Sequence, residues 1–355
     1  MPDLGTATIL RADARALPLR DNTVDLVVTS PPYFALRSYQ DGGEHYGGQI
    51  GAEATPAEFV DALLKVTREC VRVLKPSGSL WVNLGDKYAG GGGQWDKDER
   101  PDPQKRRAAS GSVGTGGRLY GARHKSLLGI PWRYALRCID DLGLILRAEI
   151  IWDKPNRLPE SVTDRVRRSH EQWFHFTLEP RYFSAVDEIR ETHKPGQSPS
   201  ALSFARPGRD KPPGQAVATH REGREAQGIH PLGKLPGSVW NIPTEPLRVP
   251  DDLGVDHFAA FPSEWPKRII QGWSPEGGTV LDPFGGTGTT AMVAKALGRH
   301  GISVDMSSDY CRLAGWRTND RDQLAKVLGV GKAEKQPAEQ GDLLALLSGA
   351  DEVTT

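Results

Sequence analysis

Cysteine is scarce in this sequence, and its placement excludes several classes of protein. The chain of 355 residues has three cysteines, Cys70, Cys138 and Cys311, which lie far apart and form no Cys-x-x-Cys pairing. This pattern argues against a disulfide framework and against a zinc site built from cysteine, and it is typical of a reducing compartment. The histidines show no ligand spacing such as His-Glu-x-x-His. We therefore expect a cytoplasmic protein without a metal site.

Long hydrophobic runs and an excess of charge are also lacking. No apolar run approaches the roughly 20 residues that cross a bilayer, and the N-terminal region carries the charged residues Asp3, Arg11 and Asp13. We therefore expect neither secretion nor membrane insertion. Lysine and arginine together number 45, as do aspartate and glutamate, so no net charge draws the whole protein onto nucleic acid. Any affinity for nucleic acid must come from local basic patches.

Short β-branched runs alternate with helical patterns along most of the chain. The expected strands cover 6–10, 24–29, 79–86, 144–152, 173–178, 279–281 and 301–305. The expected helices cover 55–75, 132–142, 263–273, a stretch that ends at 297 and one that begins at 308. We expect Pro76-Ser77-Gly78 to stop the first helix. The alternation predicts an α/β fold with a mostly parallel sheet.

Two internal segments contain too few apolar residues to fold by themselves. The segment 89–125 is rich in glycine, and we expect a mobile loop there. The segment 191–241 is dense in Pro, Gly, Ser, Lys and Arg, and we interpret it as an inserted target recognition element. The main domain is then split into a first half at 1–190 and a second half at 242–330, and 331–355 is a loosely attached tail.

A glycine-rich turn follows the strand expected at 279–281. Its sequence, Asp282-Pro283-Phe284-Gly285-Gly286-Thr287-Gly288-Thr289, lets the backbone pass close to a ligand. Gly286-x-Gly288-x-x-Ala291 matches the dinucleotide fingerprint, and Asp305 after the next strand could bind a ribose, which favours a nicotinamide-linked oxidoreductase. The Asp282 carboxylate, however, would repel a pyrophosphate and attract the sulfonium and α-amino group of S-adenosylmethionine. A flexible turn with Asp282 as a helix cap remains the alternative.

A second turn, Ser30-Pro31-Pro32-Tyr33, follows the strand expected at 24–29. The prolines fix the backbone and remove two amide donors, so carbonyl oxygens and the Ser30 hydroxyl form a rigid acceptor surface. Such acceptors suit an exocyclic base amine, and the Tyr33 ring could stack on the base. A strand terminator with an aromatic plug is the alternative. Because ligands of α/β sheets bind at the carboxyl ends of strands, we expect both turns to share one cleft.

Together these motifs resemble the amino-methyltransferases of DNA, in the permuted order in which the catalytic motif precedes the cofactor motif. The segments that carry the resemblance are VDLVVTSPPY, RECVRVLKPSGSLWVNLGD, AEIIWDKPN, HFAAFPSEWPKRII and VLDPFGGTGTT. The resemblance implies a Rossmann-like fold with helices on both faces of the sheet, S-adenosylmethionine as the cofactor, and Ser30, Pro31, Pro32 and Tyr33 as the catalytic tetrad. It also implies that the N-terminal strand, 6–10, lies beside the strand at 301–305, so that the helix beginning near 308 leads back to it.

The same resemblance assigns the cofactor contacts. It implies that Asp282, Phe284, Gly285, Gly286 and Gly288 border the methionine moiety, within the turn that also holds Pro283 and Thr289. It further implies that Asp305 binds the ribose hydroxyls, that Phe261 and Pro262 help to close the pocket, and that Asp13 lies near the adenine. The chain departs from the family in having Asp305 where a longer Glu is common, and in the length of the segment 89–125.

The expected reaction is a direct in-line transfer of methyl from sulfur to nitrogen on a base flipped out of double-stranded DNA. No cysteine lies near either turn, which excludes the carbon-5 cytosine class. In the family, Ser at the position of Ser30 favours cytosine N4, and adenine N6 remains open. The alternative functions are an oxidoreductase, an inactive DNA-binding protein, and a methyltransferase that acts on RNA or protein.

Basic side chains are the expected DNA contacts, and a restriction endonuclease is a possible companion. Those of the recognition insert are Arg206, Arg209, Lys211, Arg221, Arg224 and Lys234. Arg106 and Arg107 of the earlier loop could hold backbone phosphates. The alternative is that these charged side chains belong to loops that contact only solvent.

Overall fold

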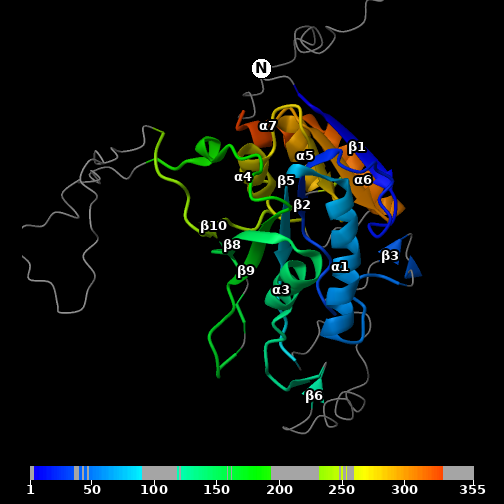
Figure 1. Cartoon of the computed structure of the whole chain (residues 1–355), viewed down its shortest axis with the longest axis vertical. Coiled ribbons are helices and arrows are strands. Elements are labelled where there is room, and N and C mark those ends of the chain that lie inside the picture. The colour runs from blue at the N-terminus through cyan, green and yellow to red at the C-terminus, as the bar shows by residue number, and fades with distance from the viewer. Residues whose placement is uncertain are drawn as a thin grey trace, which may run out of the picture.

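A single eight-stranded sheet forms the centre of the molecule in the computed structural model (Figure 1). The structure describes residues 4–35, 40–41, 44–45, 48–89, 118–119, 121–157, 159–160, 162–192, 232–247, 249–250, 253 and 260–330. The strands, in spatial order, are β1 (Thr6–Arg11), β12 (His300–Asp305), β11 (Thr279–Asp282), β2 (Val24–Thr29), β5 (Leu74–Leu84), β9 (His170–Thr177), β8 (Ile145–Asp153) and β10 (Val239–Asn241). Only β9 runs antiparallel to its neighbours in this sheet. The predicted mostly parallel sheet is confirmed.

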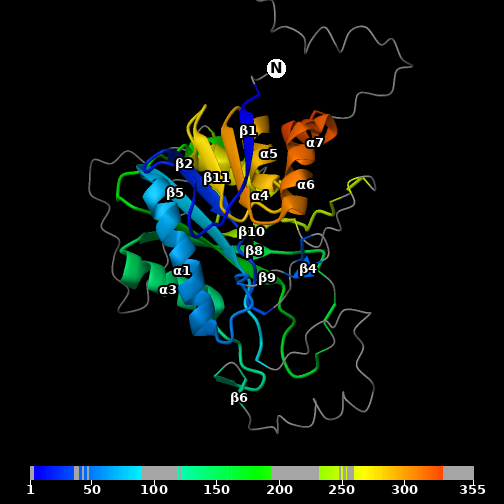
Figure 2. The ribbon, with the colours of Figure 1, turned by 90° about the vertical axis from the view of Figure 1, so that its right-hand side faces the viewer.

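Helices cover both faces of this sheet. They are α1 (Pro56–Val73), α3 (Ile130–Leu142), α4 (Glu264–Trp273), α5 (Thr289–Ala296), α6 (Ser308–Asn319) and α7 (Arg321–Leu328). Figure 2 shows α1 and α3 on one face and α4, α5, α6 and α7 on the other. Both faces of β2 are therefore buried: Val27 packs in the core beneath α1 and α3, whereas Leu26 and Val28 pack beneath α4 and α5. This double burial explains why β2 reads as a continuous apolar run.

The start of α1 agrees with the prediction, but its end does not. Thr55 and Glu58 form a capping box, in which each side chain accepts a hydrogen bond from the other residue's backbone amide. The helix ends at Val73, before Pro76-Ser77-Gly78 but two residues short of the predicted bound at 75, because Leu74 already has extended backbone angles and begins β5. A Cβ at Gly78 would lie 2.6 Å from the Leu74 side chain. The turn-forming residues are therefore folded tightly within the first part of β5.

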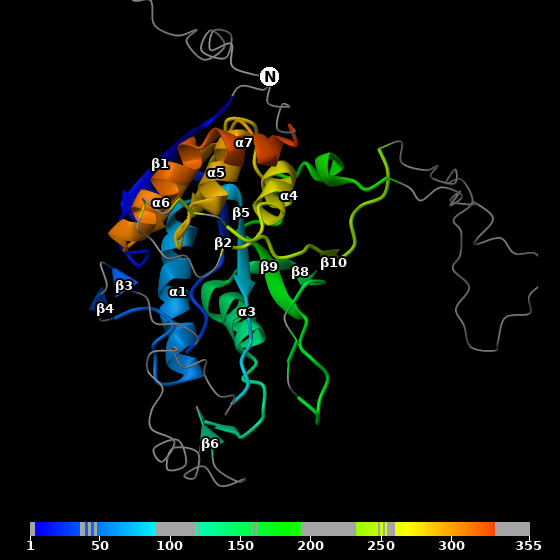
Figure 3. The same cartoon turned by 180° about the vertical axis from the view of Figure 1, so that it is seen from behind.

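The N-terminal strand lies where the sequence predicts. β1 pairs in parallel with β12, with Leu10 opposite Val304 and Arg11 opposite Asp305. Seen from behind, β1 runs along the edge of the molecule beside α6 (Figure 3). The N-terminal strand is thus the neighbour of the strand that precedes α6, as a permuted order requires, and the permutation itself stays a prediction.

The sequence did not predict several short elements. A separate helix, α7, begins where the Asp320 side chain accepts from the Gln323 amide. Two small antiparallel pairs and one 3-10 turn were also missed, namely β3 (Gln40–Asp41) with β4 (Glu44–His45), β6 (Arg118–Leu119) with β7 (Ala122–Arg123), and η1 (Val186–Ile189). Most of the predicted loop, recognition insert and tail lies outside the described residues, at 90–117, 193–231 and 331–355. Within the part of the chain that is described, no helix is long and apolar enough to span a membrane.

Candidate active site

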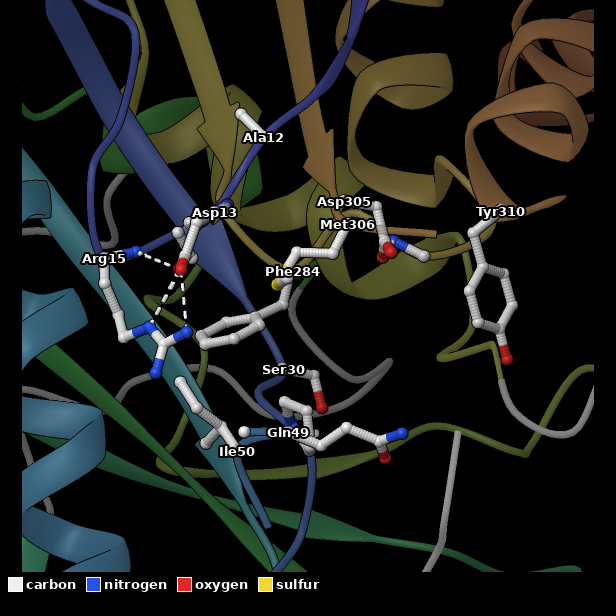
Figure 4. A pocket seen from close by; sticks show the side chains of 15 residues that line it. Ala12, Asp13, Arg15, Ser30, Gln49, Ile50, Phe284, Asp305, Met306 and Tyr310 are labelled. Carbon is white, nitrogen blue, oxygen red and sulfur yellow. Dashed lines mark hydrogen bonds and ion pairs between the residues drawn. The ribbon is translucent and has the colours of Figure 1, made fainter. Parts of the chain in front are cut away.

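A cavity lies at the carboxyl ends of β1, β2, β11 and β12, and it brings both predicted turns together (Figure 4). The turn after β2 contributes Ser30 and Pro32, and the glycine-rich turn after β11 contributes Pro283, Phe284 and Gly286. The remaining lining includes Asp13, Arg15, Gln49, Ile50, Asp305, Met306 and Tyr310. The expectation that the two turns share one cleft therefore holds.

Asp13 and Arg15 form an ion pair on one wall of this cavity (Figure 4). Arg15 Nη2 lies 2.7 Å from Asp13 Oδ2, and Arg15 Nε lies 3.0 Å from Asp13 Oδ1. These hydrogen bonds from Arg15 hold the pKa of Asp13 below its usual value. The pair presents both a donor and an acceptor next to the Phe284 ring, which suits a polar heteroaromatic ring such as adenine.

Asp305 lies at the end of β12 and holds the glycine-rich turn in place. Its Oδ2 accepts from the Gly286 amide at 3.0 Å, and its Oδ1 accepts from the Ser307 amide at 2.9 Å. Asp305 also lines the cavity. A carboxylate fixed in this way can accept further hydrogen bonds from a ligand's hydroxyl groups.

Asp282 is buried, with 1% of its surface exposed, and it ties three elements together. Its Oδ1 accepts from Thr29 Oγ1 at 2.7 Å and from the Phe284 amide at 3.1 Å, and its Oδ2 accepts from Thr290 Oγ1 at 2.8 Å. Burial raises the pKa of Asp282 to about 6 despite these hydrogen bonds. Asp282 thus joins β2, β11 and α5, and its negative charge lies behind the cavity wall.

Two glycines of the turn are required by close packing. A Cβ on Gly285 would lie 1.8 Å from Ser303 Oγ, and one on Gly288 would lie 2.7 Å from the Ala314 Cβ. Gly288 also has a positive φ of 74°. The turn can therefore lie against β12 and α6 only because these positions lack side chains.

Three other predicted cofactor residues, Thr289, Pro262 and Phe261, do not line the cavity. Thr289 is buried at the start of α5, and Pro262 is buried before α4. The Phe261 ring packs edge-on against Trp173, with 6.0 Å between ring centroids.

The residues predicted as the catalytic tetrad are held by a polar network around Asn83. Ser30 Oγ donates to Asn83 Oδ1 at 3.2 Å, and Tyr33 Oη lies 2.6 Å from both Asn83 Oδ1 and Glu171 Oε2. Asn83 is fixed in turn, because its Nδ2 donates to the Gln172 carbonyl at 3.0 Å. The Ser30 proton is therefore directed at Asn83, which leaves the lone pairs of Ser30 Oγ available as acceptors.

Glu171 is paired with Lys154, and neither residue was predicted from the sequence. Lys154 Nζ lies 2.5 Å from Glu171 Oε1 and 3.9 Å from the centroid of the Trp152 ring. The side chains are 12% and 10% exposed, and burial lowers the pKa of Lys154. Asn83 was missed as well, although a lone polar residue in the apolar strand LWVNL is a signal that could have found it.

Most of the predicted DNA-contacting residues cannot be placed. Arg106 and Arg107 lie outside the described residues, as do Arg206, Arg209, Lys211, Arg221 and Arg224. Lys234 is described, and it pairs with Glu191 at 3.1 Å on the surface. Within the described ranges, no group of three or more His, Cys, Asp or Glu residues could hold a metal ion.

Comparison with known proteins agrees with this geometry. The sequence model of the family described as DNA methylase matches residues 24–315. The chain is 37% identical to the Type II methyltransferase M.SmaI of Serratia marcescens over 315 residues, which is 88% of this chain and 90% of that protein. It is 32% identical to the Type II methyltransferase M.Cfr9I of Citrobacter freundii, with 90% of each chain covered.

A solved structure shares the fold. The PvuII DNA methyltransferase (cytosine-N4-specific) superposes with a TM-score of 0.59 at 19% identity, and 92% of each chain is covered. The architecture is therefore the Rossmann-like methyltransferase fold. The chain belongs to the N6/N4 DNA methylase family, and it is an S-adenosylmethionine-dependent methyltransferase of an exocyclic amine in DNA, at cytosine N4 or adenine N6.

Proposed function

We propose that this enzyme methylates N4 of cytosine in double-stranded DNA, on a nucleotide that has left the base stack. The observation that carries the proposal is the contact between Ser30 Oγ and Asn83 Oδ1. Because Asn83 takes the hydroxyl proton, Ser30 offers a neutral oxygen acceptor at the edge of the cavity. In the family, Ser at this position goes more often with cytosine, and Asp or Asn with adenine.

The described residues fit S-adenosylmethionine as the methyl donor. The cavity carries carboxylates at Asp13 and Asp305 with the Phe284 ring between them, and Gly286 meets it without a side chain. When bound there, S-adenosylmethionine supplies a methyl group on a positively charged sulfur. We propose that Asp305 accepts from the ribose, that Asp13 faces the adenine, and that the turn Asp282–Thr289 borders the methionine end, with Phe261 and Pro262 closing it.

The tetrad would orient and activate the target amine. The lone pair of an exocyclic amine is delocalised into the ring, so acceptors that bind its hydrogens favour a pyramidal, more nucleophilic nitrogen. Ser30 Oγ and the carbonyls next to Pro31 and Pro32 supply those acceptors. The Tyr33 ring, fixed through its hydroxyl, offers a surface on which the extruded base can stack, and this offsets part of the few kcal/mol that unstacking costs.

No covalent intermediate with the enzyme is needed for this reaction. A carbon-5 methyltransferase uses a thiolate, but none of the three cysteines lines the cavity: Cys70 and Cys138 are buried elsewhere, and the Cys311 thiol faces the backbone carbonyls of Leu10 and Asp305. Burial raises the pKa of Cys138 to about 12 and raises the pKa of Cys70 as well. Positioning and electrostatics therefore carry the catalysis.

Sequence recognition is proposed for the segment 191–241, whose arginines and lysines can contact phosphates and guanine edges. M.SmaI and M.Cfr9I are both named Type II methyltransferases. We therefore propose that this enzyme protects a DNA sequence that a companion restriction endonuclease cleaves.

The target base is tested by methylating duplex DNA and digesting it to nucleosides for mass spectrometry. N4-methylcytosine is expected, and N6-methyladenine in its place would overturn the choice of base while leaving the enzyme class intact. Long-read sequencing of the same DNA would give the sequence context. A fluorescent cytosine analogue at the target position should brighten on binding if the base leaves the stack, and an unchanged signal would contradict extrusion.

The Ser30→Ala variant tests the role proposed for Ser30. It should lose methyl transfer to DNA and keep its affinity for S-adenosylmethionine, because Ser30 is proposed to contact the base. Activity equal to that of the wild type would remove Ser30 from the catalytic assignment.

A further inference from the structure

Arg317 of α6 is a buried cation without a carboxylate partner among the described residues. Its exposed fraction is 2%, and its Nη1 donates to two neutral hydroxyls, Thr287 Oγ1 at 2.8 Å and Thr289 Oγ1 at 2.6 Å. Its Nε finds no acceptor in the described part of the chain. A buried guanidinium is costly unless an anion compensates it.

The acidic group that acts on Arg317 is already engaged elsewhere. Glu245 attracts the guanidinium electrostatically. The Glu245 carboxylate, however, forms an ion pair with Lys326 and accepts from the amide and the hydroxyl of Ser263. A positive charge therefore remains behind the glycine-rich turn.

The hydroxyl protons of Thr287 and Thr289 show where this charge can act. Both oxygens accept from Arg317, so neither proton points at the guanidinium. The two oxygens lie 3.2 Å apart, and one hydroxyl can donate to the other. At least one proton is then left without an acceptor among the described residues. Neither threonine lines the cavity, so an anion would meet this proton only where it reaches past Gly286 into the turn.

The start of α5 adds further attraction for an anion. Thr289 is the first residue of this helix, and the first amides of a helix lack partners within it and carry partial positive charge. The next residue, Thr290, contacts Asp282 instead. Two consecutive residues of the cofactor turn are thus tied to buried groups of opposite charge.

We propose that Arg317 is the positioning residue of a carboxylate subsite for S-adenosylmethionine. Through Thr287 and Thr289 it directs a hydroxyl donor and a positive field at the carboxylate of the methionine end, while Asp282 attracts the α-amino group and the sulfonium. The turn therefore binds the zwitterionic end of the ligand by charge as well as by shape. This inference rests on S-adenosylmethionine as the methyl donor and is independent of the target base.

The test compares S-adenosylmethionine with its decarboxylated analogue, which keeps the sulfonium, the amine and the adenosine. Calorimetric Kd values are measured for both ligands with the full-length wild type and with Arg317→Met. The variant should bind S-adenosylmethionine about tenfold to a hundredfold more weakly, the range for loss of a charged hydrogen bond. Its affinity for the decarboxylated analogue should change less than about threefold, because that ligand has no carboxylate to lose.

Two further variants keep the test decisive. Thr287→Val removes one donor hydroxyl without removing the cation, and it should give a smaller loss that is again confined to S-adenosylmethionine. It replaces Arg317→Met if that variant does not fold, as judged by circular dichroism. Arg312→Met, on the same helix with its side chain 51% exposed, is the matched control and should bind both ligands as the wild type does.

The other outcomes would overturn the proposal. An equal loss for both ligands would mean that Arg317 only supports the fold of the turn. Unchanged affinity for S-adenosylmethionine in Arg317→Met and in Thr287→Val would mean that the carboxylate binds elsewhere. Failure of the wild type to bind S-adenosylmethionine would instead reject the cofactor assignment, and methylation of an unexpected base would leave this inference untouched.

Discussion

Tyr33 has two separable features, a ring that can stack on a base and a hydroxyl that anchors the ring. The hydroxyl lies 2.6 Å from both Asn83 Oδ1 and Glu171 Oε2, and Glu171 is held by Lys154. On the other side, a Cβ on Gly85 would lie 2.5 Å from the Tyr33 ring, so that position must stay open. The ring is therefore fixed before a base arrives, which lowers the entropy cost of the reactive arrangement.

The variant Tyr33→Phe separates these two features. It keeps the ring but loses the anchoring hydrogen bonds, so we expect kcat to fall about tenfold to a hundredfold, as for about 1.4–2.8 kcal/mol of lost positioning. The Kd of S-adenosylmethionine should not change. Single-turnover methylation and calorimetry measure the two quantities. Tyr182→Phe, at a tyrosine outside the cavity, is the control, and a wild-type kcat in Tyr33→Phe would show that the anchor is unnecessary.

Asp282 predicts a pH dependence of cofactor binding. Burial, with a smaller contribution from Asp305, raises its pKa from the usual 3.8 to about 6. Because the pKa is higher in the folded protein than in the unfolded chain, the free energy of unfolding is about 3 kcal/mol larger when Asp282 is protonated than when it is ionised. This contribution is fully present below pH 3.8 and is lost as the pH rises through 6. The ionised form that then dominates is the one that attracts a cationic ligand.

We therefore expect the affinity for S-adenosylmethionine to increase between pH 5 and pH 7, as Asp282 ionises with a pKa of about 6. Asp282→Asn should bind more weakly at pH 7, without this rise, and should be at least as resistant to urea at pH 8 as the wild type. Calorimetry across the pH range and urea titration measure both effects. A wild-type pH profile in Asp282→Asn would assign the titration to another group.

At the scale of the element, the turn between β11 and α5 depends on backbone that only glycine allows. Gly288 combines a φ of 74° with a position where a Cβ would lie 2.7 Å from the Ala314 Cβ. Gly288→Ala should lower the free energy of unfolding by about 2–4 kcal/mol, from strain and overpacking together. It should also weaken S-adenosylmethionine binding. Chemical denaturation and calorimetry provide the two readouts.

Gly315 supplies the matched control on the neighbouring helix. A Cβ there meets nothing within 4 Å, and the residue lies inside α6. Gly315→Ala should therefore stabilise the protein by up to about 1 kcal/mol, the difference in helix propensity. Equal stability of Gly288→Ala and the wild type would show that the turn can relax around a methyl group.

Local patterns predicted most elements because each carried its own signal. The doubly buried β2 has the bounds that its apolar run indicates, and α3 ends at Gly143, which has the positive φ expected of a helix end. α1 ends two residues before the predicted bound at 75, and the segment 75–78 bulges out of the pairing between β5 and β2, where Leu74 lies opposite Val24 and Ser79 opposite Leu26. The sequence predicted one helix from 308 onward, but the structure has two, α6 and α7, because Asp320 ends the first and caps the second.

Sequence reasoning predicted the site residues that lie in turns facing the cavity. It missed the residues that support these turns from other elements. Ser30 and Phe284 follow strands whose carboxyl ends meet at one edge of the sheet, and sequence reasoning can place such ends together. Asn83, Glu171 and Arg317 act through contacts between elements far apart in the chain. Such contacts depend on strand order and helix packing, which no local pattern contains.

At the scale of the molecule, the sheet joins the two halves that the sequence separated. β2 lies in the first predicted half and β11 in the second, and the two strands pair in parallel at the centre of the sheet. Asp282 adds a side-chain link across this junction through Thr29. The proposed tetrad and cofactor turn therefore share one core, and unfolding of either half would expose the other.

This arrangement predicts a single cooperative thermal transition, with calorimetric and van't Hoff enthalpies that agree. S-adenosylmethionine at 100 times its Kd should add about 2.7 kcal/mol to the free energy of unfolding and shift the whole transition upward, because the ligand binds at the junction. Differential scanning calorimetry with and without the ligand is the measurement. Two resolved transitions, only one of which shifts with the ligand, would contradict this expectation. They would mean that the halves unfold independently despite the shared sheet, because ligand binding stabilises only the unit that holds the site.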